Sequence, residues 1–314
     1  MSDQASEQTG PEVWGGGVNT WECDEMGHMN VRFYVAKSME GLAGLAAFLG
    51  MPHAFAPHAE STLLVREQHI RFLREARPGA GLYMTGGVVE MGETDARLLM
   101  VMRHLDGTPA ATFQTLVSHA TPRDGAAFAW SARMREAAAA IAVPLPAYAA
   151  PRSLPLDPVV TEASLERAES LGLKRIAMGV VGPQDCDVFG RMQVDQFMGR
   201  VSDGIPRLLG RRPTADEVEG APGARIGGAA LEYRLIHHGW PRVGDRLEMR
   251  SGTAYADGKV RRFVHWLLDP ATGGPWGTAA AIAVNFDLDA RKVVTLGPDA
   301  AAAVQAQVIE GLTL

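Results

Sequence analysis

Cysteine is scarce in this sequence: Cys23 and Cys186 are the only two among its 314 residues. They can form one disulfide at most and cannot supply a CxxC pair, which excludes a disulfide-stapled scaffold and a cysteine-rich zinc site. No histidine stands where it would obviously act as a base for either thiol. We therefore expect buried, free and reduced cysteines rather than nucleophiles, and reduced thiols favour a cytoplasmic location.

Long hydrophobic runs and blocks of positive charge are also missing. No apolar run reaches the roughly 18–20 residues that cross a bilayer, and the polar, acidic first residues do not read as a targeting peptide. The net charge is −6, and the lysines and arginines form no cluster. We therefore expect neither a membrane nor a nucleic acid as partner.

Motifs for nucleotides, metals and serine nucleophiles do not occur. The sequence contains no GxGxxG, no P-loop, no GxSxG and no HExxH. His237 and His238 are adjacent in a predicted strand, where successive side chains point to opposite faces, so joint metal binding is not expected. The sequence predicts no metal and no cofactor.

What the chain does contain is one motif in two versions. The matching segments are WECDEMGHMN (21–30) with QDCDVFGRMQ (184–193), and GAGLYMTGG (79–87) with GDRLEMRSG (244–252). Cys, Asp, Gly and Met recur at the same spacing in the first pair, but His28 is replaced by Arg191 and Asn30 by Gln193. Two separate blocks repeated at nearly equal separation indicate two copies of one domain.

The length suits two domains of about 150 residues each, and a hydrophobic content of 46% supplies a core for both. A proline-rich stretch, PLPAYAAPRSLPLDP, separates the copies, and proline interrupts both helices and central strands. The predicted division is a loose tail (1–12), a first domain (13–143), a linker (144–158) and a second domain (159–314).

Each copy has the pattern of one long helix followed by strands. The segment 31–50 has apolar residues at helical spacing, with Asn30 as a plausible N-cap and Gly50 just beyond the end. Its counterpart, 194–210, contains Pro206, which predicts a kink or an early end. Short turns between the strands imply antiparallel pairing. The predicted strands are 62–73, 81–91, 96–105 and 110–120, then 229–238, 245–256, 260–269 and 277–289. This is an α+β fold in which the helix covers one sheet face.

A DxxGHxN motif that opens a long helix, followed by four antiparallel strands, resembles the hotdog-fold thioesterases. The resembling residues are WECDEMGHMNVRFYVAKSMEGL and, in the next strands, IRFLREARPGAGLYM. More narrowly, the sequence is similar to the 4-hydroxybenzoyl-CoA thioesterase-like family. The resemblance covers 13–143 well and 174–292 more weakly, through DCDVFGRMQVDQFM.

The resemblance implies two tandem hotdog domains that form an intrachain pseudo-dimer with two unequal sites. The implied function is that of an acyl-CoA thioesterase, which hydrolyses a thioester to a free acid and CoA, so that CoA is part of the substrate and not a cofactor. A homodimer or a higher homo-oligomer of the whole chain is a further implication. Aromatic, short aliphatic and hydroxylated acyl groups all stay open.

Thioester hydrolysis needs a carboxylate that activates water or attacks the carbonyl carbon, and N–H donors for the oxygen that becomes negative. Asp24 lies just before the predicted helix, whose first N–H groups lack partners and lie at the positive end of the dipole. Gly27 permits close approach of a ligand or a positive φ. By the resemblance Asp24 is the catalytic carboxylate, as nucleophile or general base. A cap or turn aspartate is the alternative.

Other residues of the first copy are candidates for the same site. His28 would orient the substrate or polarise the thioester carbonyl, or be a loop histidine. Asn30 would cap the helix or hydrogen-bond within the site, and Tyr34 would pack or line the site. Glu67 and His69 are expected to share one strand face with Leu63, Val65 and Arg71. There they would line the cleft or lie on an exposed sheet face.

Asp187 takes the place of Asp24 in the second copy, so the resemblance implies a second site. Arg191 stands where the first copy has His28, and a cation beside Asp187 would hold that carboxylate ionised and lower its basicity. We expect this second site to be degenerate or weaker, or else retuned for an anionic group of the substrate.

Two other functions are compatible with the sequence. A hotdog hydratase or dehydratase would use an Asp–His pair in a different motif, typically with Asn-Pro between, and no proline separates Asp24 from His28. A non-catalytic acyl-CoA or acyl-carrier binding protein could reuse the same fold, although the retention of Asp in both copies argues against it.

Overall fold

The computed structural model describes residues 9–220 and 222–314. The chain divides into two compact units, Met1–Ala150 and Pro151–Leu314, and their boundary falls inside the proline-rich stretch 144–158. Most of the predicted tail lies outside the described residues. Thr9, near the end of this tail, is described and is buried. The hydroxyl of Thr9 lies 2.7 Å from the hydroxyl of Thr85.

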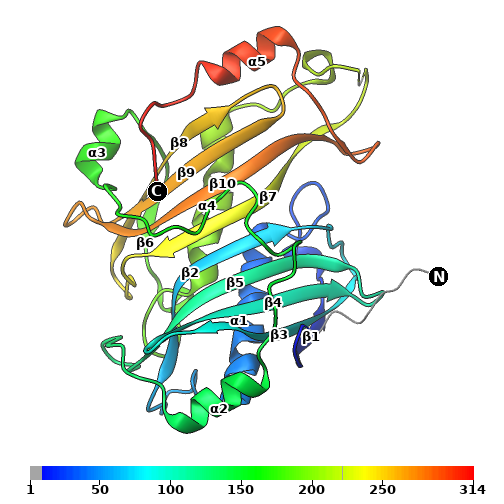
Figure 1. The fold of residues 1–314 in the computed structure, drawn as a ribbon. Helices are drawn as coiled ribbons and strands as arrows, with labels where there is room; N and C mark the ends of the chain where they lie inside the picture. The colour runs from blue at the N-terminus through cyan, green and yellow to red at the C-terminus, as the bar shows by residue number, and fades with distance from the viewer. Residues whose placement is uncertain (1–8, 221) are drawn as a thin grey trace. The chain divides into compact units, whose positions relative to one another are not determined.

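Unit 1 (Met1–Ala150) contains one antiparallel sheet with the strand order β1-β3-β4-β5-β2. Its strands are β1 (Glu12–Gly17), β2 (Thr62–Phe72), β3 (Gly81–Met91), β4 (Asp95–His104) and β5 (Pro109–Ala120). Two α-helices, α1 (Val31–Phe48) and α2 (Ala132–Ala140), accompany the sheet, as Figure 1 shows. One long helix followed by antiparallel strands confirms the predicted α+β pattern, although β2 pairs with β5 and not with β3, the next strand along the chain.

Local sequence explains the limits of α1. The side chain of Asn30 accepts a hydrogen bond from Arg32 N at 3.0 Å, so Asn30 is the N-cap. Gly50 follows the helix with φ +81°, a conformation that favours glycine. Within the helix, a Cβ at Gly41 would lie 3.1 Å from Met84 Cε and 3.3 Å from Met100 Sδ. The missing side chain therefore lets α1 approach the sheet closely.

A bulge in β2 changes which side chains share a face. The register against β5 shifts between Val65, which faces Val117, and Glu67, which faces Leu116. Because paired residues point to the same side and alternate along a strand, Glu67 and Val65 lie on opposite faces. The expectation that they share a face is therefore wrong, and the physical reason is the extra residue Arg66.

Helix α1 covers one face of the unit 1 sheet, and the segment 141–150 covers the other. On the α1 side, Gln68 Nε2 donates to the Ser38 hydroxyl of the helix at 3.1 Å. On the far side, Leu99 and Val101 pack against Val143 and Ala149. Glu67 and His69 belong to this second face and are buried there.

The strands of unit 2 (Pro151–Leu314) also pair antiparallel, in the order β7-β10-β9-β8-β6, with β11 paired to β10. Its strands are β6 (Lys174–Val180), β7 (Ile226–His237), β8 (Arg246–Ala256), β9 (Val260–Leu268), β10 (Pro275–Asp287) and β11 (Lys292–Val293). Its α-helices are α3 (Leu165–Ser170), α4 (Val194–Leu209) and α5 (Pro298–Gln305).

Helix α4 continues through Pro206 and ends at Leu209, so the early end predicted from this proline is wrong. Pro206 stands in the last turn, where one missing N–H removes little of the helix ladder. Its own carbonyl still accepts a hydrogen bond from Gly210 N at 2.9 Å. None of the described helices in either unit is long and apolar enough to cross a membrane.

Candidate functional site

Asp24 organises a tight turn in front of α1. Its Oδ1 accepts hydrogen bonds from Met26 N at 2.9 Å and from His28 N at 3.2 Å. Its backbone N donates to His28 O at 2.9 Å, and Gly27 N donates back to Asp24 O at 3.0 Å, with Gly27 at φ +76°. Oδ2 accepts no hydrogen bond from the described residues. Asp24 thus has one oxygen in the turn and one open to a ligand.

The turn is fixed to α1 and to the loop after β2. Met29 N donates to Ala76 O at 2.8 Å, and Asn30 N donates to Glu22 O at 2.9 Å. Glu22 is buried and forms an ion pair with the buried Lys37 of α1 at 2.7 Å. The candidate carboxylate is therefore held on a rigid support at the start of the helix.

The first N–H of α1 is available to a ligand. Asn30 Oδ1 accepts from Arg32 N, and Asn30 O accepts from Phe33 N at 2.9 Å. No described residue accepts a hydrogen bond from Val31 N–H. An unpaired amide at the positive end of an 18-residue helix is suited to an oxygen that becomes negative.

His28 is buried, and its Nε2 lies 3.1 Å from Oε2 of Glu75. Glu75 follows β2 and is the residue of this site that sequence reasoning missed. The segment IRFLREA contains it, and an acidic residue between an arginine and an alanine carries no motif of its own. A carboxylate beside an imidazole fixes the ring orientation and its tautomer.

Tyr34 supports the loop after β2 and packs against Phe72. The Tyr34 hydroxyl accepts a hydrogen bond from Ala76 N at 3.0 Å, and its ring meets Phe72 edge to face at 5.2 Å. Burial is the main cause that raises the pKa of Tyr34 to about 12.

The Cys23 thiol is free but half-buried, so the expected full burial is wrong. Burial, then Asp24, raises its pKa, which does not favour a thiolate nucleophile.

Glu67 and His69 are not brought to Asp24 within unit 1. Both lie on the sheet face opposite α1, and Glu67 Oε1 lies 3.3 Å from Arg97 Nη1. On the same face Gln114 Nε2 donates to Ala149 O at 2.8 Å. The polar side chains of this face therefore bind one another and the covering segment.

The second copy rebuilds the same turn with different side chains. Asp187 Oδ1 accepts from Phe189 N at 2.8 Å and from Arg191 N at 3.0 Å, and Gly190 has φ +75°. The ion pair between Asp185 and Arg200, at 3.2 Å, stands where the first copy has Glu22 and Lys37.

The second copy differs at the free carboxylate oxygen. Asp187 Oδ2 accepts a hydrogen bond from Arg191 Nε at 3.3 Å, whereas Oδ2 of Asp24 has no such partner. The cation of the second copy thus occupies the carboxylate oxygen that is free in the first copy. Cys186, like Cys23, is free and half-buried.

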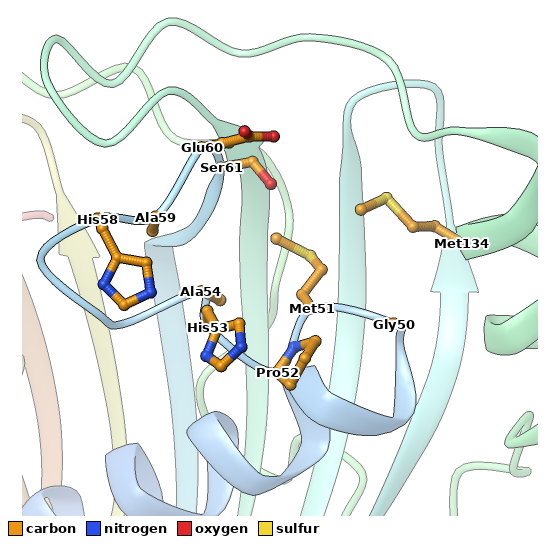
Figure 2. Close-up of a pocket in the computed structure, with 10 residues that line it drawn as sticks. All are labelled: Gly50, Met51, Pro52, His53, Ala54, His58, Ala59, Glu60, Ser61 and Met134. Atoms are coloured by element: carbon orange, nitrogen blue, oxygen red, sulfur yellow. The ribbon is translucent and has the colours of Figure 1, made fainter.

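A cavity of about 340 Å³ lies beyond the other end of α1. Figure 2 shows Met51, Ala54 and Met134 around it, together with His53 and His58, whose ring centroids are 5.5 Å apart. None of the predicted site residues lines this cavity. Among the described residues, no group of three or more histidine, cysteine or acidic side chains could hold a metal ion.

The model of the thioesterase-like superfamily matches the chain over residues 18–147 and again over 181–304. The two segments together make up most of the sequence, and each falls within one unit. The chain therefore belongs to the thioesterase-like superfamily and carries two hotdog segments of that family, as the sequence predicted.

Solved structures resemble the chain at the level of the fold. An acyl-ACP thioesterase from Bacteroides thetaiotaomicron has 11% sequence identity and a TM-score of 0.63, with 86% of this chain and 96% of that chain covered. The 12:0-ACP thioesterase from Umbellularia californica has 11% identity and a TM-score of 0.65, with 87% and 93% covered. No curated protein matches the chain significantly.

Proposed function

We propose that the protein hydrolyses an acyl-CoA thioester to the free acid and CoA, and that Asp24 is the catalytic carboxylate. The observation that carries the proposal is the free Oδ2 of Asp24 beside the start of α1, on a turn fixed by two backbone amides. Membership of the thioesterase-like superfamily supports the reaction class.

In the general-base version, Oδ2 of Asp24 takes a proton from water while the water oxygen bonds to the thioester carbon. Val31 N–H then stabilises the carbonyl oxygen, which becomes negative. Collapse of the intermediate breaks the carbon–sulfur bond, and the CoA thiolate takes the proton back. In the nucleophile version, Oδ2 itself attacks the carbon, the thiolate leaves, and water hydrolyses the resulting anhydride.

His28 and Glu75 are the supporting pair in this proposal. His28 hydrogen-bonds or polarises the thioester carbonyl, and Glu75 orients its ring through the 3.1 Å contact. Asn30 acts through the helix, since its side chain caps Arg32 N. Gly27 keeps the turn open to the substrate. Tyr34 supports the loop that carries Glu75.

An acyl carrier protein is a second candidate for the group that carries the thioester. The two structural relatives named above are both described as ACP thioesterases, and CoA and ACP present the acyl group on the same phosphopantetheine arm. The reaction at Asp24 is identical for both carriers. The intrachain pseudo-dimer, the cytoplasmic location, the absence of a cofactor and homo-oligomer formation stay predictions from the sequence.

The decisive experiment measures release of free thiol from a panel of acyl-CoA and acyl-ACP substrates by the purified full-length chain. Asp24→Asn should reduce kcat by roughly 10²- to 10⁴-fold, the scale of a positioned acid–base group. The matched control Asp187→Asn should reduce it far less. Full activity of Asp24→Asn together with loss in Asp187→Asn would place catalysis in the second copy. Hydration of enoyl-CoA without thiol release would indicate a hydratase, and tight binding with neither activity would indicate a binding protein.

A further inference from the structure

The connection between α1 and β2 contains the same tripeptide, Pro-His-Ala, twice within ten residues, MPHAFAPHAE (51–60). In each copy the alanine N–H donates to the carbonyl oxygen three residues earlier, at 3.1 Å for Ala54 and at 3.0 Å for Ala59. Each copy is thus a tight turn with proline in second place, where its fixed φ favours the turn. His53 and His58 therefore both occupy the third place of a preorganised turn.

The two turns are anchored to each other and to the end of α1. Met51 and Ala54 are buried, and Met51 N donates to Ala46 O, in the last turn of α1, at 2.9 Å. Ala56 N donates to His53 O at 2.9 Å and so joins the first turn to the second. The backbone that carries both histidines is therefore held in place without the help of a ligand.

The two imidazole rings lie beside each other at the edge of the cavity of about 340 Å³, as Figure 2 shows. Their centroids are 5.5 Å apart, and their planes are inclined by 48°. Two imidazoles that bind one metal ion through nitrogens at about 2.0–2.1 Å have ring centres roughly 5 Å apart when the bonds diverge at a near-tetrahedral angle. The observed separation is therefore close to that of two rings on a single ion.

Both rings are available to an ion. The side chains of His53 and His58 are exposed, and neither ring has a hydrogen-bond partner among the described residues. A neutral imidazole carries one nitrogen with a free lone pair, which is the atom that ligates a metal. The counterpart connection in the second copy, 210–225, contains no histidine, so the pair is specific to unit 1.

The surroundings of the two rings favour a cation. The cavity lies beyond the C-terminus of α1, which is the negative end of the dipole of an 18-residue helix. Glu60 is among the residues that line the cavity, and no lysine or arginine is among them. Met51 and Met134 line it as well, and thioethers, like imidazoles, are ligands of copper. Charge and ligand type therefore both suit a transition-metal ion.

We propose that His53 and His58 together bind one transition-metal ion of the class that prefers imidazole, Zn²⁺ or Cu²⁺, with water completing the coordination. Two protein ligands make an open site, which differs from the closed cysteine and histidine clusters that the sequence excludes. The ion ties the two turns together and so stabilises the connection between α1 and β2. An 18-residue helix is about 27 Å long, and Asp24 precedes its other end, so this site is separate from the proposed thioesterase reaction.

The test measures metal binding by titration calorimetry with the full-length, tag-free chain. Zn²⁺ and Cu²⁺ should each bind, with Cu²⁺ the tighter of the two, and Mg²⁺, which prefers oxygen ligands, should not. His53→Gln and His58→Gln should each weaken binding by at least the roughly 10- to 100-fold that removal of an outer-shell partner costs. The matched control His104→Gln, at the end of β4, should bind as the wild type does.

Melting temperatures provide a second measurement. A metal that binds only the folded chain raises the melting temperature, so Zn²⁺ should raise that of the wild type and not that of either histidine variant. In EDTA the two variants should melt with the wild type, because the turns are held by backbone hydrogen bonds. Both variants should also keep the wild-type rate of thiol release, and Asp24→Asn should keep wild-type metal affinity.

Three results would overturn the proposal. The first is a dissociation constant weaker than about 1 mM for both Zn²⁺ and Cu²⁺. The second is binding of equal strength in the wild type and in both histidine variants, which would place the ion elsewhere. The third is a loss in one of these variants alone, which would mean that a single histidine holds the ion. A chain that binds metal through both histidines but releases no thiol would leave the metal site standing and contradict only the proposed function.

Discussion

His28 Nε2 lies 3.1 Å from Glu75 Oε2, and neither partner is kept in the second copy. Met29 N binds Ala76 O in unit 1, and Met192 N binds Pro241 O in unit 2. This correspondence aligns Glu75 with Trp240, while His28 aligns with Arg191. The pair is therefore specific to the copy in which Asp24 has a free oxygen.

Replacement of Glu75 by glutamine should lower kcat more than it raises KM. In the proposed mechanism Glu75 is a positioning residue that acts through His28 by the charge of its carboxylate. Removal of that charge should lower the rate by roughly 10-fold or more, the scale of about 1.4 kcal/mol. The measurement is the steady-state rate of thiol release as a function of pH. A purely structural role would lower the melting temperature and leave the shape of the pH–rate profile unchanged.

Lys37→Met should destabilise unit 1 strongly. Lys37 and Glu22 are both buried, and removal of one partner from a buried pair costs about 3–5 kcal/mol. The matched change Arg200→Met in unit 2 should cost less, because Arg200 is 30% exposed. Urea unfolding of both variants gives the comparison, and equal losses would contradict this ranking.

Gly27→Ala and its counterpart Gly190→Ala test the inequality of the two motifs. Both glycines have positive φ, +76° and +75°, so an alanine at either position should cost about 1–2 kcal/mol of stability. Only Gly27→Ala should also lower thiol release, since its turn carries the free carboxylate oxygen. A similar loss of activity in both variants would indicate two working sites.

Acid should destabilise unit 2 through His265. This histidine is buried in β9, its Nδ1 lies 2.8 Å from the Ser251 hydroxyl, and burial lowers its pKa from 6.5 to about 3. The unfolded chain therefore binds a proton below pH 6.5 that the folded chain refuses. The contribution of neutral His265 to the free energy of unfolding is complete above pH 6.5. It is lost as the pH falls toward 3, so that the free energy of unfolding decreases by up to about 1.4 kcal/mol per pH unit.

The acid effect is measured by urea unfolding at pH 7 and pH 5. His265→Gln should flatten the difference between the two pH values, because glutamine does not titrate. An unchanged pH dependence in this variant would assign the effect to other groups.

Most of the fold was predictable because its signals are local. Asn30 and Gly50 bracket α1, and turn residues separate the strands, so predicted and observed limits differ by only a few residues. The helices α2, α3 and α5 were missed, since each is short and follows a loop without a long apolar stripe. The bulge at Arg66 was also missed, because alternation along a strand gives no sign of an inserted residue.

The site was predictable only as far as the motif extends. Asp24, Gly27 and His28 are neighbours in the sequence, so their shared turn follows from spacing. Glu75 reaches His28 through the fold, from the loop after β2. For the same reason the sheet face of Glu67 and His69 was not predicted correctly relative to Val65, because it depends on the bulge that separates them from Val65.

The turn hydrogen bonds of Asp187 have an evolutionary consequence. Because its Oδ1 accepts hydrogen bonds from two backbone amides, an aspartate stabilises this turn whether or not the copy performs chemistry. Selection would therefore preserve this acid long after a duplicated copy had stopped turning over substrate. Persistence of the aspartate alone is a poor marker of an active member of the superfamily. The residue four positions later, histidine in one copy and arginine in the other, is the more informative marker.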